Sequence, residues 1–132
     1  MNLDYIIAAE TAFFSDDKRV NIIKVFEKIK LTKKGEPKED LPVPPFSFSI
    51  VGKVSGDYGD GVSVLILDKD GEVVLKETKI EAAEHEKDFF NFIIQVNGLL
   101  LKNDGNYVVT VKDFDGKNTI SEKHKLFSVT KD

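Results

Sequence analysis

The sequence contains no cysteine, and this absence limits the chemistry that the protein can perform. Without thiols the chain can form no disulfide scaffold, no iron–sulfur cluster, no thiolate metal site and no cysteine nucleophile. A chain without cysteine fits a reducing compartment, so we expect a cytoplasmic protein. The first residues, from Met1 to Tyr5, lack the basic segment and apolar run of a secretion signal. No apolar stretch approaches the roughly 20 residues of a membrane-spanning helix.

Arginine and tryptophan are also scarce, since Arg19 is the only arginine and tryptophan is absent. Arginine is the preferred side chain for contacting bases and phosphates, and the net charge of the chain is −4 with scattered lysines. Nucleic acid is therefore not an expected partner. Without tryptophan, carbohydrate binding would depend on Tyr58 and Phe114 at two predicted loop tips, and packing over the edge of the core is the simpler role for each.

The 132 residues are enough for one hydrophobic core, and we expect a single domain over residues 1–132. Short runs rich in Val, Ile and Phe alternate with turns rich in Gly, Asp and Lys. This pattern predicts an all-β fold, an antiparallel β-sandwich of about eight strands that is immunoglobulin-like or related. The predicted strands span residues 5–14, 20–31, 46–54, 62–67, 73–80, 89–96, 107–112 and 118–129.

Three segments differ from the regular strand pattern. The stretch from Val20 to Leu31 also places apolar residues at a helical period, and its strand alternation slips in phase, but its β-branched residues favour a strand. Residues 81–87 favour one short helical turn between two strands. The proline- and lysine-rich segment 32–45 predicts a solvated connection, because it lacks the flanking arginine of a proline-rich recognition ligand.

Four segments resemble a bacterial family of small β-sandwich proteins. They are KRVNIIKVFEKI at 18–29, LPVPPF at 41–46, LDKDG at 67–71 and GNYVVTV at 105–111. With them the chain resembles domain of unknown function 6941, whose pattern has an early K-x-N-I-x-G-x-F-D-x-I segment, a D-x-D-G hairpin and a G-x-Y-x-F strand. Lys24 stands where that pattern usually has Gly, and Glu27 where it often has Asp. The resemblance implies the fold and carries no catalytic or binding residues.

No arrangement of residues predicts catalysis. The sequence has neither a G-x-S-x-G nucleophile elbow nor a phosphate-binding glycine loop. His85 and His124 are the only histidines, and neither has a neighbour at metal-ligand spacing, so both are expected on the surface. We therefore expect a protein that is not an enzyme, with no catalytic, cofactor or metal site.

The acidic loops hold the most notable group of polar residues. If successive strands alternate in direction, the loops after the first, third, fifth and seventh strands gather at one end of the sandwich. Those loops carry Asp16, Asp17, Asp57, Asp60, the acidic run 81–86, Asp113 and Asp115, whereas Asp68 and Asp70 lie at the opposite end. Carboxylates suit Ca²⁺, although Asp and Gly are also ordinary turn formers.

The sequence favours one function and leaves a second open. The favoured function is a non-catalytic binding or assembly module whose sandwich edge or loops contact another protein, because exposed edge strands are natural pairing surfaces. The alternative is a calcium- or small-ligand-binding sandwich that uses the acidic end loops.

Overall fold

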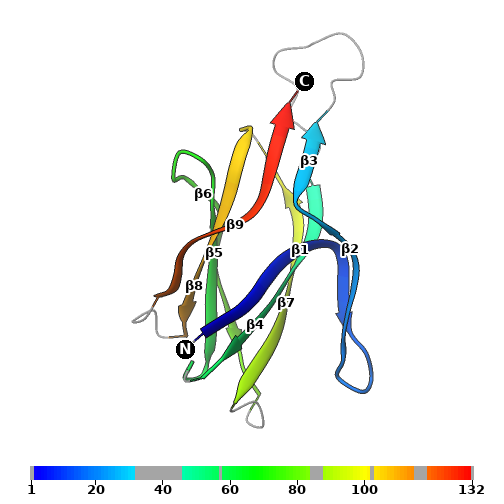
Figure 1. The fold of residues 1–132 in the computed structure, drawn as a ribbon, viewed down its shortest axis with the longest axis vertical. Coiled ribbons are helices and arrows are strands. Elements are labelled where there is room, and N and C mark those ends of the chain that lie inside the picture. Colours follow the sequence, from blue (N-terminus) through cyan, green and yellow to red (C-terminus); the bar gives the residue numbers. More distant parts are fainter. Residues whose placement is uncertain are drawn as a thin grey trace.

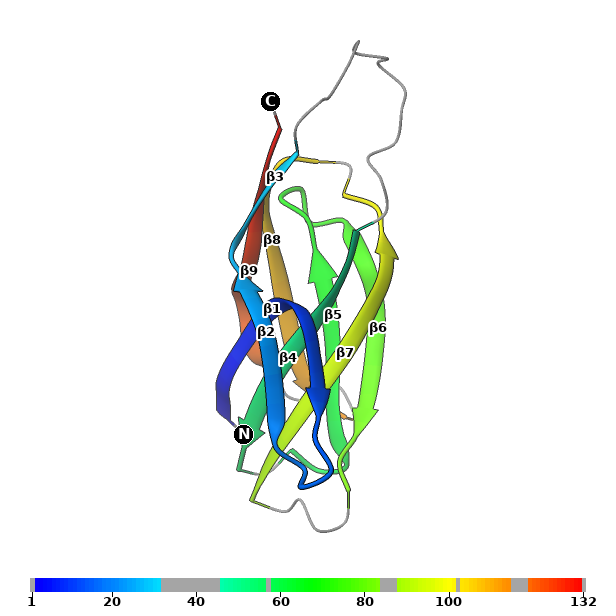
Figure 2. The same cartoon turned by 90° about the vertical axis from the view of Figure 1, so that its right-hand side faces the viewer.

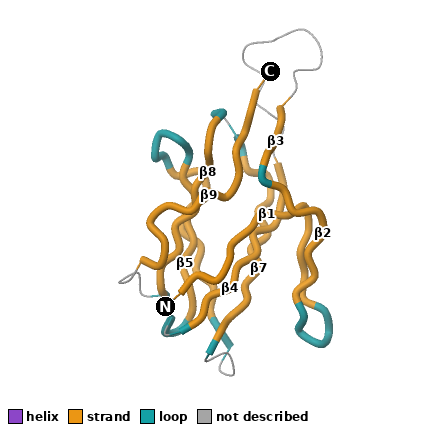
Figure 3. Tube along the Cα trace, viewed as in Figure 1, coloured by secondary structure: helices purple, strands orange, loops and turns teal. Residues whose placement is uncertain are grey.

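In a computed structural model, the chain folds into two β-sheets packed face to face (Figure 1; Figure 2). The structure describes residues 2–31, 46–56, 58–83, 88–101, 103–114 and 119–131. The strands are β1 (Asn2–Phe14), β2 (Val20–Phe26), β3 (Lys28–Leu31), β4 (Phe46–Ser55), β5 (Gly61–Leu67), β6 (Val73–Glu81), β7 (Phe89–Leu99), β8 (Gly105–Asp113) and β9 (Thr119–Lys131). All regular structure in these ranges is strand (Figure 3), so the predicted all-β sandwich is confirmed.

One sheet has the order β2-β1-β4-β7 and the other β3-β9-β8-β5-β6. From β4 onward the chain follows an immunoglobulin-type Greek key, with β4 beside β7 in one sheet and β8 between β9 and β5 in the other. The start of β8 carries the tyrosine corner of such sandwiches, because the Tyr107 hydroxyl donates to the carbonyl oxygen of Asn103 at 2.7 Å. The Tyr107 ring is buried and stacks on Phe127.

The core lies between the sheets, where alternate residues of facing strands bury apolar side chains. Phe48 and Phe127 meet edge to face with 5.4 Å between ring centroids, and this contact joins the two sheets. Tyr58 is only 3% exposed and packs against Phe90, which confirms its predicted role at the edge of the core. Phe114 is half-buried, and the Lys79 ammonium lies over its ring.

The single strand predicted over residues 20–31 is wrong, because this segment forms β2 and β3 in different sheets. The chain breaks at Glu27, whose carbonyl oxygen accepts a hydrogen bond from the Ser128 N–H at 2.9 Å. Phe26 and Ile29 both pack against the core, and one continuous strand cannot direct residues three apart to the same face. The slip in the alternation of apolar residues over 20–31 corresponds to this break. A helix over this segment, the alternative that the sequence left open, is wrong, because both of its parts are strands.

The strand β3 also corrects the prediction of a purely antiparallel sandwich, since it pairs in parallel with β9. The helical turn predicted over 81–87 is not seen in its described part, because Glu81 ends β6 and residues 82 and 83 are not helical. Residues 84–87 and the connection 32–45 lie outside the described residues. Within the described ranges, no helix is long and apolar enough to cross a membrane.

The strand β1 is bent, and its two halves have different neighbours. Residues 2–9 pair with β4, whereas residues 8–14 pair with β2. The second half and β2 form a hairpin beside the first sheet, at the right in Figure 1 and in front in Figure 2. Ala9, Ala12 and Val51 are buried outside the central core, and the Gln95 side-chain amide donates to the Ala12 carbonyl oxygen at 3.0 Å. The hairpin therefore covers part of the outer face of this sheet.

Candidate protein-binding surface

Exposed apolar side chains gather on the β1–β2 hairpin, which we define as residues 10–26. Eight large apolar side chains are exposed in the described part of the chain, and five of them lie on this hairpin. These five are Phe13 (46% exposed), Phe14 (48%), Ile22 (36%), Ile23 (46%) and Val25 (53%). Soluble monomers rarely expose large contiguous apolar patches, and such patches mark sites of interaction.

The exposed residues occupy both faces of the hairpin. Strand residues alternate between faces, and the pairing register keeps even positions opposite even ones. Phe14 and Ile22 therefore share one face with the buried Ala12, and Phe13 and Ile23 share the other. A hairpin that packed one face on its own sheet and left the other in water would have a polar outer face. This hairpin has no such polar face.

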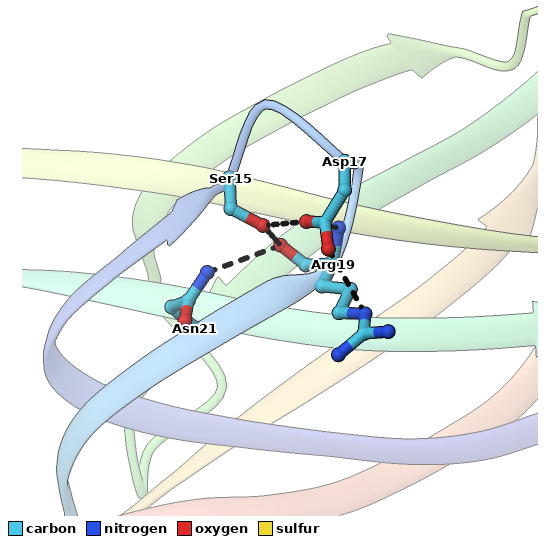
Figure 4. A network of polar contacts seen from close by, with 4 residues as sticks. All are labelled: Ser15, Asp17, Arg19 and Asn21. Atoms are coloured by element: carbon cyan, nitrogen blue, oxygen red, sulfur yellow. Dashed lines mark hydrogen bonds and ion pairs between the residues drawn. The ribbon is translucent and has the colours of Figure 1, made fainter.

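Polar contacts link the residues at the tip of the hairpin (Figure 4). The Ser15 N–H donates to the Arg19 carbonyl oxygen at 2.9 Å, and the Asn21 amide donates to the same oxygen at 3.2 Å. The Ser15 hydroxyl donates to the Asp17 carboxylate, and the Arg19 Nε lies 3.0 Å from the other oxygen of that carboxylate. The Ser15 hydrogen bond lowers the pKa of Asp17 below its usual value. The fixed turn presents the single arginine of the chain to solvent.

Lys24 has an unusual backbone for a strand residue. Its φ is 57°, in the left-handed region that L-residues other than glycine enter only at a cost. Its ammonium lies 3.7 Å from a carboxylate oxygen of Glu10 on β1, and both side chains are exposed. Because β2 is the outermost strand of its sheet, a charged residue with distorted backbone restricts how another strand can pair with it.

At the lower end of the sandwich in Figure 1, the end of β4 lies beside the start of β7 and the start of β5 beside the end of β6, so the described ends of two of the four predicted acidic loops meet. The Ala82 N–H donates to the Asp60 carbonyl oxygen at 2.8 Å, and the Gly56 N–H donates to that of Asp88 at 3.1 Å. Among the residues that the structure describes, no three acidic or histidine side chains are placed to hold a metal ion. Residues 57, 84–87 and 115 of the predicted acidic cluster, His85 among them, lie outside the described residues.

Asp68 fastens the turn at the opposite end of the sandwich. One carboxylate oxygen accepts the N–H groups of Asp70 at 2.9 Å and Glu72 at 3.0 Å, and the other accepts the Asn103 amide at 3.0 Å. Burial alone would raise the pKa of Asp68, but these hydrogen bonds outweigh it and lower the pKa. Two of the donors belong to the β5–β6 turn itself and the third, Asn103, belongs to the β7–β8 connection. The Asp68 carboxylate therefore links the β5–β6 hairpin to the β7–β8 connection.

Two grooves lie along the open sides of the sandwich. A groove of about 440 Å³ between β6 and β7 has a mixed lining, with apolar Leu75 and Leu99 beside polar residues such as Asp68 and Asn103. A second groove of about 420 Å³ lies between β1 and β9, and Tyr5 and His124 are among its lining residues. His124 is exposed, as predicted.

From the sequence, a binding surface was expected on a strand edge or a loop, and no residue of the hairpin was named for it. The signal was the presence of apolar residues at adjacent positions on both sides of a polar turn, as in Phe13–Phe14 and Ile22–Ile23. Adjacent residues of a strand lie on opposite faces, so such pairs make both faces apolar.

Comparison of the chain with protein-family models, with curated proteins and with solved structures finds no match.

Proposed function

We propose that this protein is a non-catalytic protein-binding module and that the β1–β2 hairpin is its docking surface. The observation that carries the proposal is the concentration of five of the eight exposed large apolar side chains on this one hairpin. With about 200 Å² for a whole Phe and somewhat less for Ile and Val, the exposed parts of the five amount to about 400 Å². Divided between the two faces of the hairpin, that is about half of the roughly 800 Å² that each partner contributes to a standard interface.

The composition and rigidity of the hairpin support the same function. Protein interfaces are enriched in aromatic residues and arginine, and the hairpin carries Phe13, Phe14 and the only arginine of the chain. The Arg19 side chain is 84% exposed. The hydrogen-bonded tip is already ordered, so binding loses less conformational entropy there than on a flexible loop.

The proposal is tested by removing the apolar surface of one face of the hairpin. The variant Phe13→Ser with Ile23→Thr changes two exposed side chains, and Val73→Thr with Leu100→Ser is the matched control because both residues are also exposed. Partners are captured on immobilised wild-type protein from the source cells, and each purified partner is then titrated calorimetrically.

We expect the hairpin variant to bind a captured partner at least tenfold more weakly than wild type, and the control to bind normally. The melting temperature of the hairpin variant should stay close to that of wild type, because neither side chain is in the core. Equal affinity of the wild type and the hairpin variant for every partner would show that the hairpin is not the docking surface.

A second candidate function, small-ligand binding, is supported by the groove between β6 and β7. Its volume of about 440 Å³ falls within the range of ordinary ligand pockets, roughly 300–1,000 Å³. Screening a fragment library by NMR tests this candidate, with shifts of the Leu75 and Leu99 resonances as the expected result. A library that leaves both residues unperturbed would contradict it.

The calcium alternative is checked by calorimetric titration of the full chain with CaCl₂.

A further inference from the structure

We propose that the partner of the hairpin is a second copy of this chain, held by antiparallel pairing between the two β2 edges. This inference rests on the proposed function, because it names the occupant of the same surface. In the described part of the chain, β2 is the last strand of its sheet and pairs only with β1. Pairing two such edges would join the four-stranded sheets of both copies into one continuous sheet.

The hydrogen-bond phase of the hairpin limits the registers in which two β2 edges can pair. Ser15 and Arg19 form a hydrogen-bonded pair, because the Ser15 N–H donates to the Arg19 carbonyl oxygen. In an antiparallel ladder such pairs recur at every second residue, so Asn21, Ile23 and Val25 direct their backbone groups towards β1. Among the even-numbered residues, Val20, Ile22 and Phe26 direct theirs towards the free edge, whereas the left-handed backbone of Lys24 interrupts the ladder. A pairing of two β2 edges must therefore place even positions opposite even positions.

Charge selects one of the three registers that are centred on the middle of β2. If Ile22 lay opposite Ile22 of the second copy, Arg19 would lie opposite Val25. If Lys24 lay opposite Lys24 of the second copy, two ammonium groups would meet. If Ile23 lies opposite Ile23 of the second copy, Arg19 lies opposite Glu27 at both ends of the interface. The third register thus puts an apolar pair at the centre and an opposite-charge pair at each end.

The side chains of this register are available for the contact. Arg19 is 84% exposed, and its ion pair with Asp17 is itself exposed, so water screens that pair and the guanidinium can exchange partners. Glu27 is also exposed and follows the last residue of β2 directly. The pairing would place Lys24 opposite Ile22 of the second copy, and this keeps the two lysines apart.

The surface area predicts a dimer that dissociates on dilution. Edge pairing covers only the flanks of the β2 side chains and leaves Phe13 and Phe14 on β1 outside the contact, so it removes from water much less than the ~800 Å² of apolar surface that two whole hairpins expose. The interface is therefore smaller than the roughly 1,200 Å² at the lower end of the range for specific stable interfaces, which is why dilution should dissociate the dimer.

A charge swap tests both the dimer and its register. The full chain is studied by sedimentation velocity over a wide concentration range as wild type, Arg19→Glu, Glu27→Arg and an equimolar mixture of the two variants. Each single variant alone places like charges opposite each other at both ends of the dimer. In the mixture, Glu at position 19 meets Arg at position 27, and the unchanged Arg19 meets the unchanged Glu27. Lys76→Glu, an exposed charge change on β6, is the control.

We expect wild type and control to dimerise equally, each single variant to dimerise at least tenfold more weakly, and the mixture to regain wild-type affinity. If the single variants and the mixture all associate like wild type, this register is wrong. A wild type that stays monomeric at every concentration but binds a different protein through the hairpin overturns this inference and leaves the proposed function intact. A wild type with neither a second copy nor a hairpin-dependent partner contradicts both.

Discussion

Lys24 allows a sharp test of the hairpin, because its backbone is left-handed in the middle of a strand. In an ordinary strand, glycine is less stable than alanine by about 0.5–1 kcal/mol, since glycine loses more backbone entropy on folding. At a φ of 57° the order should reverse, because a Cβ atom in the left-handed region costs about 1–2 kcal/mol that glycine does not incur. The difference between the two effects makes Lys24→Gly more stable than Lys24→Ala by about 0.5–1 kcal/mol.

The difference in stability between Lys24→Gly and Lys24→Ala reports the backbone alone, because both variants lose the same lysine side-chain contacts. Both variants lose the ion pair with Glu10, whose charged atoms are 3.7 Å apart. That pair is exposed and contributes less than about 1 kcal/mol in any case. Lys76 on β6 provides the matched control, since its φ is not positive and its side chain is exposed. At position 76, alanine should be more stable than glycine.

Urea and thermal unfolding followed by far-UV circular dichroism measure these differences. We expect the Lys24→Gly variant to melt about 2–4 °C above Lys24→Ala. If alanine is as stable as glycine at position 24 while the control pair shows the usual order, residue 24 is not left-handed in solution. The pattern of domain of unknown function 6941 has glycine at this position, and a left-handed backbone is a physical reason for glycine there. The resemblance to that family stays a prediction.

Three further changes test the sandwich itself. Tyr107→Phe keeps the stacked ring but removes the hydrogen bond to the Asn103 carbonyl oxygen, so urea denaturation should show a loss of about 1 kcal/mol, and an unchanged free energy of unfolding would contradict the tyrosine corner. Gly52→Ala would put a Cβ 2.7 Å from Cε1 of Phe92, and the displaced ring should cost about 1–3 kcal/mol. Most of that cost should disappear in a Phe92→Leu background, and an equal cost in both backgrounds would refute the contact. The pKa of Asp68 is lowered in the folded state, so its stabilisation is present above the unfolded pKa of about 4 and is lost as pH falls through the folded pKa. Below about pH 4, stability should therefore fall less steeply in Asp68→Asn than in wild type, and parallel pH profiles would show that Asp68 does not contribute.

Much of the fold could be predicted because strands and turns depend on local sequence. Alternating apolar residues such as Phe90, Phe92 and Ile94 face the core in β7, and their period of two was visible in the sequence. The D-x-D-G turn was visible as well, since Asp68 accepts N–H groups from its own neighbours two and four residues along the chain. Features fixed within a few residues of the chain are the ones that sequence patterns report.

The arrangement of β1, β2 and β3 could not be predicted, because distant partners determine it. The break at Glu27 depends on the Ser128 N–H about a hundred positions later in the chain. The bent hairpin is joined to the first sheet by the hydrogen bond from Gln95 to the Ala12 carbonyl oxygen, a residue pair far apart in the sequence. Without the bend, the sequence gives no sign that Phe13 and Ile23 remain exposed rather than packing in the core. The candidate binding surface was therefore the least predictable part of the molecule.

The proposed dimer also explains why an exposed apolar edge need not lead to open-ended association. In a twofold pairing both copies use the same edge, so the interface closes on itself, whereas pairing β2 of one copy with β7 of another would propagate along a fibre. The charge of Lys24 opposes pairings that bring two of these lysines together. In the twofold register each Lys24 lies opposite Ile22 of the other copy, so the two lysines stay apart. Sedimentation should therefore show monomer and dimer without larger species, and larger species that form in Lys24→Val but not in wild type would identify Lys24 as the residue that limits assembly.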